Sequence, residues 1–151
     1  MSNQIFANPA DLVLPAQSGY GKPTIGALYL GSVSALSPEF LKKHDITMVV
    51  SMTRVPVLKN IAHFQYPIPD ERSSNAEMQR RLPAICANIH AHRKAGHNVL
   101  VHCYAGVHRA PTVVAHYLQR YEGHTVKTAI EKIRRARYIA FIDGNTFDLR
   151  V

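Results

Sequence analysis

Along the chain, segments with the apolar pattern of a β-strand alternate with segments in which apolar residues recur at the spacing of an α-helix. Short β-branched or alternating runs predict strands at residues 24–32, 46–52, 63–69 and 96–103. Apolar positions spaced three and four residues apart, or helix-start signals, predict helices at residues 36–45, 75–94, 110–121 and 126–136. This alternation predicts an α/β fold: a single-domain sandwich with a central, mostly parallel sheet that is flanked by helices.

The beginning of the chain does not follow this pattern. The run "NPADLVLPAQSGYGKP" is broken repeatedly by proline and glycine, which interrupt regular structure. We therefore expect residues 1–24 to be a loosely packed N-terminal arm. Residues 25–151 should then form one domain, a size that can bury a substantial core.

Composition narrows the class of protein. The chain has 46% hydrophobic and 19% charged residues, which is typical of a globular protein. Its two cysteines are too few for a disulfide framework, and we see no secretory signal, membrane-length apolar run or lipidation signature. These features favour the cytoplasm or the nucleus, without a membrane span or lipid anchor.

The net charge of +8 favours an acidic partner such as a phosphoprotein, nucleic acid or anionic lipid, although a basic solvated surface explains it equally well.

The chemistry concentrates in "VHCYAGVHR", where a predicted strand ends at Cys103 and a helix begins after Arg109. Unpaired N–H groups at a helix N-terminus, wrapped into a tight loop with Gly106, form a nest for an anion. A helix N-terminus and a neighbouring cation also stabilise the thiolate form of a cysteine. Because the planar guanidinium of Arg109 matches two phosphate oxygens, the loop predicts covalent phosphoryl transfer to Cys103.

The same nine residues resemble the H-C-x-x-G-x-x-R signature of the cysteine-dependent protein tyrosine phosphatases. The short chain and its layout are most similar to the dual-specificity branch, over residues 25 to about 148. The resemblance implies a phosphatase-like catalytic domain at 25–151 that hydrolyses phosphoprotein through a phosphocysteine intermediate and needs no cofactor. It implies that His102 organises the loop by hydrogen bonding. It also implies substrate binding by the residues Tyr104, Ala105, Gly106, Val107, His108 and Arg109.

The family also uses an aspartate, about 30 residues before the cysteine, to protonate the leaving group. Asp70, in "YPIPDERSSN", occupies that place, and the adjacent Glu71 is the second candidate. Asp70 could instead have a structural role only, as a residue that caps or precedes the long helix predicted at 75–94.

Two loop positions depart from the family. His108 stands where serine is common, and Ala110 replaces the serine or threonine that usually follows the arginine. The run Arg-Ala-Pro is similar to that of the phosphatases of regenerating liver, which are slow enzymes, so we expect slow turnover.

The remaining histidines and Cys86 suggest no further chemistry. The histidines lack a metal-ligand spacing, so no metal site is expected. Cys86 fits a small core residue, and a regulatory disulfide with Cys103 stays open.

Four functions fit a cysteine in an anion-binding loop. The leading one is a protein tyrosine or dual-specificity phosphatase. The same chemistry could act on RNA 5′-phosphates or phosphoinositides, which the basic charge favours and the lack of loop lysines disfavours. A non-catalytic phosphoprotein-binding module would need neither Cys103 nor Asp70, and a rhodanese-like sulfur transferase would not need Asp70.

Overall fold

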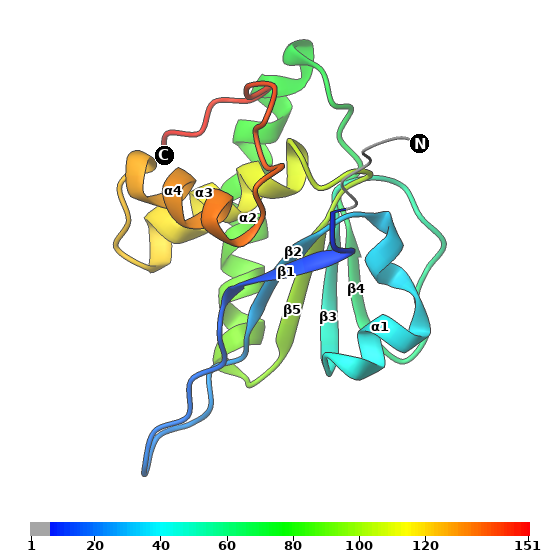
Figure 1. Ribbon diagram of the computed structural model, residues 1–151, viewed down its shortest axis with the longest axis vertical. Coiled ribbons are helices and arrows are strands. Elements are labelled where there is room, and N and C mark those ends of the chain that lie inside the picture. The colour runs from blue at the N-terminus through cyan, green and yellow to red at the C-terminus, as the bar shows by residue number, and fades with distance from the viewer. Residues whose placement is uncertain (1–6) are drawn as a thin grey trace, which may run out of the picture.

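The computed structural model describes residues 7–151 and contains a five-stranded sheet in the order β1-β2-β5-β3-β4. The strands are β1 (Ala10–Leu14), β2 (Leu28–Gly31), β3 (Ile46–Ser51), β4 (Ala62–Gln65) and β5 (Asn98–His102). β1 is antiparallel to β2, whereas β2, β5, β3 and β4 pair in parallel. The prediction of an α/β fold with a mostly parallel sheet is confirmed (Figure 1).

The helices lie close to the predicted ranges. They are α1 (Pro38–Lys43), α2 (Asn75–Lys94), α3 (Arg109–Tyr121) and α4 (Val126–Ala136), with short 3₁₀ turns at Val33–Leu36 and Arg72–Ser74. α1 begins where its sequence signals place it, because the Ser37 side chain accepts a hydrogen bond from the Phe40 N–H at 3.2 Å and Pro38 occupies the first turn.

Successive residues of the central strands point into two separate cores. In β5, Val99 and Val101 join the larger core beneath α2 and α3, while Leu100 joins a smaller core with Leu41 of α1. This follows from the period of two in a strand, and it explains why β5 is apolar throughout. Figure 1 shows α2, α3 and α4 together on one side of the sheet and α1 on the other.

The expectation of a loosely packed arm is wrong for residues 10–14. They form β1, which pairs with β2 and buries Val13 and Leu14. The physical reason is that β2 would otherwise be a sheet edge with unpaired backbone groups. From the sequence, the flanking Pro9 and Pro15 indicate a loop, yet a strand of five residues fits between them. Residues 1–6 of the expected arm lie outside the described residues.

The parallel strands bring three chain segments to one edge of the sheet. Gly31 and Ser51, which end β2 and β3, are both in register with His102 at the end of β5. Loops that leave the carboxyl ends of parallel strands share this edge, which is where α/β proteins bind ligands.

Among residues 7–151, no helix has the length and apolar character needed to cross a membrane.

Candidate active site

Cys103 follows directly after β5 and is 2% exposed, at the base of a cavity of about 280 Å³. Its N–H donates to the Gly31 carbonyl at 3.4 Å, which ties the cysteine to the neighbouring strand. The wall of this cavity is formed by Asp70, Cys103, Tyr104, Ala105, Val107, His108, Arg109 and Asp143. The structure therefore brings the predicted nucleophile, cation and acid together in one cavity.

The loop between Cys103 and α3 turns its carbonyl groups outward. Each carbonyl from Tyr104 to Val107 accepts a hydrogen bond from outside the loop: Val33 N–H to Tyr104, Arg137 to Ala105 and Gly106, and Phe141 N–H to Val107. None of the N–H groups from Tyr104 to Arg109 donates to residues 7–151. An anion in the cavity would meet these N–H groups together with the N-terminus of α3.

Gly106 is required by the backbone at this point. Its φ is +72°, a left-handed conformation, and an added Cβ would lie 2.8 Å from the Gly31 backbone and from the Arg137 guanidinium. A side chain here would be strained and would also push the loop away from its supports.

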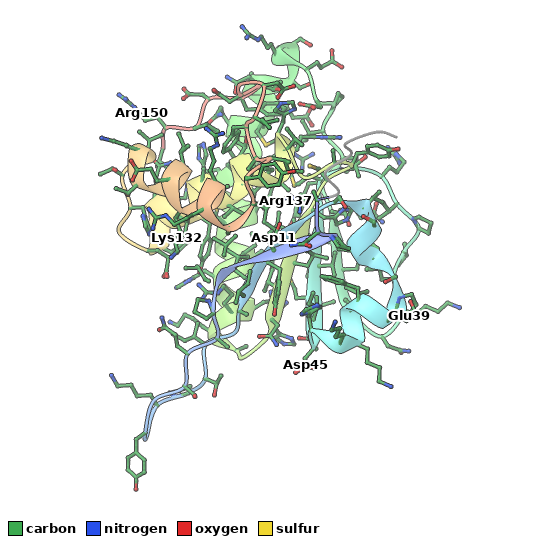
Figure 2. The ribbon with its side chains drawn as sticks, in the orientation of Figure 1. Asp11, Glu39, Asp45, Lys132, Arg137 and Arg150 are labelled. Atoms are coloured by element: carbon green, nitrogen blue, oxygen red, sulfur yellow. The ribbon has the colours of Figure 1, made fainter. Side chains whose placement is uncertain are left out.

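Arg137 holds the loop by hydrogen bonds and is not part of the cavity wall. Its guanidinium donates to the Gly106 carbonyl at 3.1 Å and to the Ala105 carbonyl at 3.0 Å. It also pairs with the Asp11 carboxylate of β1 at 3.0 Å, and Figure 2 shows the two side chains beside each other. The Arg137 side chain is only 1% exposed, so its guanidinium is buried and binds the loop and β1 rather than solvent.

Arg137→Ala is expected to lower the free energy of unfolding by on the order of 3 kcal/mol, because it leaves Oδ2 of Asp11 and two loop carbonyls without their donor. Arg135→Ala, on the exposed side of α4, is the control and should change stability little. Chemical denaturation of the three proteins measures the difference. Equal stability of both variants would show that Arg137 does not hold the loop.

Among residues 7–151, the hydrogen bonds that anchor the Arg109 guanidinium all come from Nη1. Nη1 donates to the Ile68 carbonyl at 3.0 Å and to the Met52 carbonyl at 3.4 Å, which fixes the side chain against the end of β3 and the loop after β4. Its Nε is buried without a hydrogen-bond partner among the described residues. A buried donor without a partner costs free energy, so an anion accepting from Nε in this cavity would be stabilised.

Asp70 reaches the cavity through a hydrogen bond with a loop side chain. Its Oδ2 lies 2.9 Å from Nδ1 of His108, whose Nε2 lies 2.6 Å from Oδ1 of Asp143. Glu71 does not line the cavity, and its carboxylate instead accepts from the Ser73 hydroxyl at 2.8 Å. Of the two candidate acids, Asp70 is the one that the fold brings to Cys103.

His102, which directly precedes Cys103, is a neutral imidazole with a hydrogen bond at each ring nitrogen. Its Nδ1 donates to the Cys103 carbonyl at 3.0 Å, so its Nε2 accepts from the Ser51 hydroxyl at 2.5 Å. That hydroxyl in turn accepts from Nε2 of His63 at 2.7 Å. Burial lowers the pKa of His102 to about 4, which keeps the ring uncharged at neutral pH.

The second cysteine takes no part in the site. Both Cys86 and Cys103 are free thiols, and Cys86 is buried with Sγ 3.8 Å from the Val113 carbonyl. Burial raises the pKa of Cys86 to about 12, so it remains a protonated core residue. Among residues 7–151, no group of three or more His, Cys, Asp or Glu side chains is arranged to hold a metal ion.

Sequence reasoning missed three residues that shape the site. Asp143 lies 40 positions beyond the cysteine in an irregular segment. Arg137 follows the basic residues of α4 and reads as one more surface charge, and Ser51 reads as the end of a buried strand. Nothing in their local sequence indicates a partner, because each contacts residues that are distant along the chain.

Comparison with known proteins gives consistent matches. The chain matches the family model of the dual specificity phosphatase catalytic domain over residues 28–147. Rat dual specificity protein phosphatase 15 is 32% identical over 116 residues, covering 75% of this chain and 48% of that protein. Rat dual specificity protein phosphatase 5 is 35% identical over 114 residues, covering 74% of this chain and 30% of that protein.

A solved structure extends the match to the fold. The crystal structure of human DUSP28 has 26% sequence identity and a TM-score of 0.73, covering 89% of this chain and 85% of that one. The chain spans less than half the length of the two rat relatives.

Proposed function

Because this chain belongs to the dual specificity phosphatase catalytic-domain family, we propose that it hydrolyses phosphorylated proteins through a phosphocysteine intermediate. The observation that carries the proposal is the cavity itself. Cys103, the loop residues and Arg109 line the same cavity. The loop N–H groups and the buried Nε of Arg109 have no hydrogen-bond acceptor among the described residues. These donors suit the equatorial oxygens of a phosphoryl group in transfer.

The reaction divides into two steps. In the first, the Cys103 sulfur attacks phosphorus and the ester P–O bond breaks, while Asp70 gives its proton to the departing oxygen. In the second, Asp70 takes a proton from water, the water oxygen attacks phosphorus, and Cys103 leaves as a thiolate with release of inorganic phosphate. Arg109 and the loop N–H groups hold the phosphoryl group through both steps.

The position of Asp70 supports an enzyme over the other classes considered. A module that only binds phosphoprotein needs the anion nest but no acid, and a sulfur transferase also has no use for one. Asp70 lines the cavity that contains Cys103, as expected for protonation of a leaving group. A thiolate nucleophile must also stay reduced, and for this reason we infer the cytoplasm or the nucleus.

The substrate class is tested by a panel assay. The purified chain is given a phosphotyrosine peptide, a phosphothreonine peptide, 5′-triphosphorylated RNA and a phosphoinositide, each at low and moderate salt. We expect kcat/KM to be highest for the phosphopeptides, with the tyrosine ester leading. Preference for RNA or phosphoinositide would assign the same chemistry to that substrate, and inactivity on all four would contradict hydrolysis.

Ala110 is expected to make the second step slow. It is fully buried in the first turn of α3 and carries no hydroxyl to stabilise the sulfur as negative charge develops on it. Thr112 does not supply one, because its hydroxyl donates to the His108 carbonyl at 2.7 Å. A hydrogen bond to a charged group contributes about 1.5–3 kcal/mol, which is roughly 10- to 150-fold in rate.

Rapid-quench kinetics measure this effect. The parent protein should show a burst of product followed by a slower steady state, and Ala110→Ser should reduce the burst and raise kcat. Thr112→Val is the control, since its hydroxyl bonds to the backbone, and should leave the ratio of burst to steady rate unchanged. No burst in the parent, with unchanged kcat in Ala110→Ser, would show that the missing hydroxyl does not limit turnover.

A further inference from the structure

His108 lies between two carboxylates that come from distant parts of the chain. Asp70 belongs to the loop after β4, and Asp143 belongs to the segment after α4. The imidazole contacts Asp70 through Nδ1 at 2.9 Å and Asp143 through Nε2 at 2.6 Å. His108 is mostly buried, with 17% of its side chain exposed, whereas the Asp143 side chain is 68% exposed.

These contacts fix how many protons the cluster holds. An ionised carboxylate only accepts hydrogen bonds, so two carboxylates on one imidazole require a proton in each contact. The contact with Asp143 uses the Nε2–H of the ring. The contact with Asp70 then holds one further proton, which sits either on Nδ1 of His108 or on Oδ2 of Asp70.

The surroundings of His108 favour retention of this proton. The titratable and charged groups that line its cavity are Asp70, Asp143, Cys103, Tyr104 and Arg109. Burial, the largest single effect, would lower the pKa of His108, but the hydrogen bonds to Asp70 and Asp143 and the charges of these two carboxylates together outweigh it and raise the pKa. The hydrogen bond from His108 lowers the pKa of the Asp143 carboxyl, which therefore stays ionised.

We propose that Asp70 and His108 share one proton and together serve as the proton donor of the reaction, with Asp143 as the positioning residue that holds the imidazole. The proposal rests on the phosphatase function proposed above and deepens it. A serine at position 108, the common choice in the family that the loop resembles, could not share the proton in this way.

The protons balance over the cycle. In the first step the shared proton moves from Asp70 to the leaving oxygen as the ester P–O bond breaks, which leaves Asp70 ionised and His108 neutral. In the second step Asp70 receives a proton from the attacking water as the P–S bond breaks. That proton is again shared with Nδ1 of His108, while Nε2–H remains on Asp143 throughout.

The consequence is a distinctive pH dependence. Two groups that share a proton titrate as a unit, so the falling limb of kcat/KM reports the pair and lies at higher pH than for an isolated aspartic acid. Removal of His108 takes one of the two bases from this unit, so the falling limb should then lie at lower pH. At pH values below both limbs the donor is protonated with or without His108, so the difference between the two proteins should shrink there.

The test compares pH profiles of the parent, His108→Ser and Asp143→Asn on a phosphotyrosine peptide. We expect His108→Ser to lose about 10-fold in kcat/KM near pH 8, as the falling limb moves to lower pH by about one unit, and the loss should shrink as the pH falls. Asp143→Asn should move the limb in the same direction by a smaller amount. Asp148→Asn removes a carboxylate from the same C-terminal segment outside this cavity, and it should leave the limb in place.

A second measurement does not depend on activity. The ring nitrogens of His108, followed by ¹⁵N NMR in the parent protein, should titrate above the ordinary histidine range, and they should titrate lower in Asp70→Asn and Asp143→Asn. An inactive parent would remove the phosphatase proposal, and this titration would still decide whether the proton is shared. Equal losses at every pH in His108→Ser, or an unmoved limb in an active protein, would overturn the inference.

Discussion

Cys103→Ser is expected to abolish turnover while phosphate-ester binding persists. A serine hydroxyl in the same position stays protonated and is a weak nucleophile, so the rate should fall on the order of 10³-fold or more. Binding should survive, because the loop N–H groups and Arg109 do not depend on the sulfur. Turnover of a phosphotyrosine peptide and calorimetric binding of the same peptide measure the two effects separately.

The other free thiol provides the control for this substitution. Cys86 is buried in α2 away from the cavity, so Cys86→Ala should keep the parent kcat even if it lowers stability. Activity of Cys103→Ser near the parent level would rule out covalent catalysis. Loss of binding together with turnover would instead show that the substitution disrupts the loop.

Asp70→Asn is expected to lower the rate by roughly 10²-fold or more for substrates with a poor leaving group, since a positioned acid contributes about this much. Asparagine cannot donate a proton to the departing oxygen. The loss should shrink for an activated aryl phosphate, whose leaving group needs little protonation. Rates for a phosphothreonine peptide and an aryl phosphate, measured on the same preparation, give the comparison.

The neighbouring carboxylate is the matched control for Asp70. Glu71→Gln removes the same charge one residue later, where the side chain bonds Ser73 and does not line the cavity. It should be nearly harmless, and the falling limb of the kcat/KM profile should vanish only in Asp70→Asn. A harmless Asp70→Asn beside a damaging Glu71→Gln would mean that the acid is Glu71.

The local part of the fold was predictable because short-range patterns encode it. The spacing of Met78, Leu82, Ile85 and Ile89 predicts one face of a helix, and α2 spans Asn75–Lys94 as expected. The apolar run that ends in His102 predicts β5, since a strand buried on both faces lacks polar alternation. β1 was missed because its evidence is its pairing with β2, which no pattern within residues 10–14 reveals.

In the site, too, the sequence reveals residues that are close along the chain but not those that only the fold brings together. Cys103, Gly106 and Arg109 lie within seven residues, so the junction of strand and helix makes their shared chemistry visible in the sequence. Arg137 and Asp143 act on that loop from beyond α4, across contacts that only the folded chain creates. By sequence, His108 was one of several loop residues expected to bind substrate. Its two carboxylate partners become apparent only when the loop after β4 and the C-terminal segment meet in the fold.

The most direct test is to trap the phosphocysteine. The parent and Asp70→Asn are mixed with an activated aryl phosphate, quenched in acid within the first turnover, and digested for mass spectrometry. Asp70→Asn suits the experiment because formation of the intermediate needs little acid here, whereas its breakdown lacks the base. We predict a phosphoryl group on the peptide containing Cys103, most abundant in Asp70→Asn and absent from Cys103→Ser. Continued turnover of the aryl phosphate with no label on Cys103 in either protein would contradict the covalent mechanism.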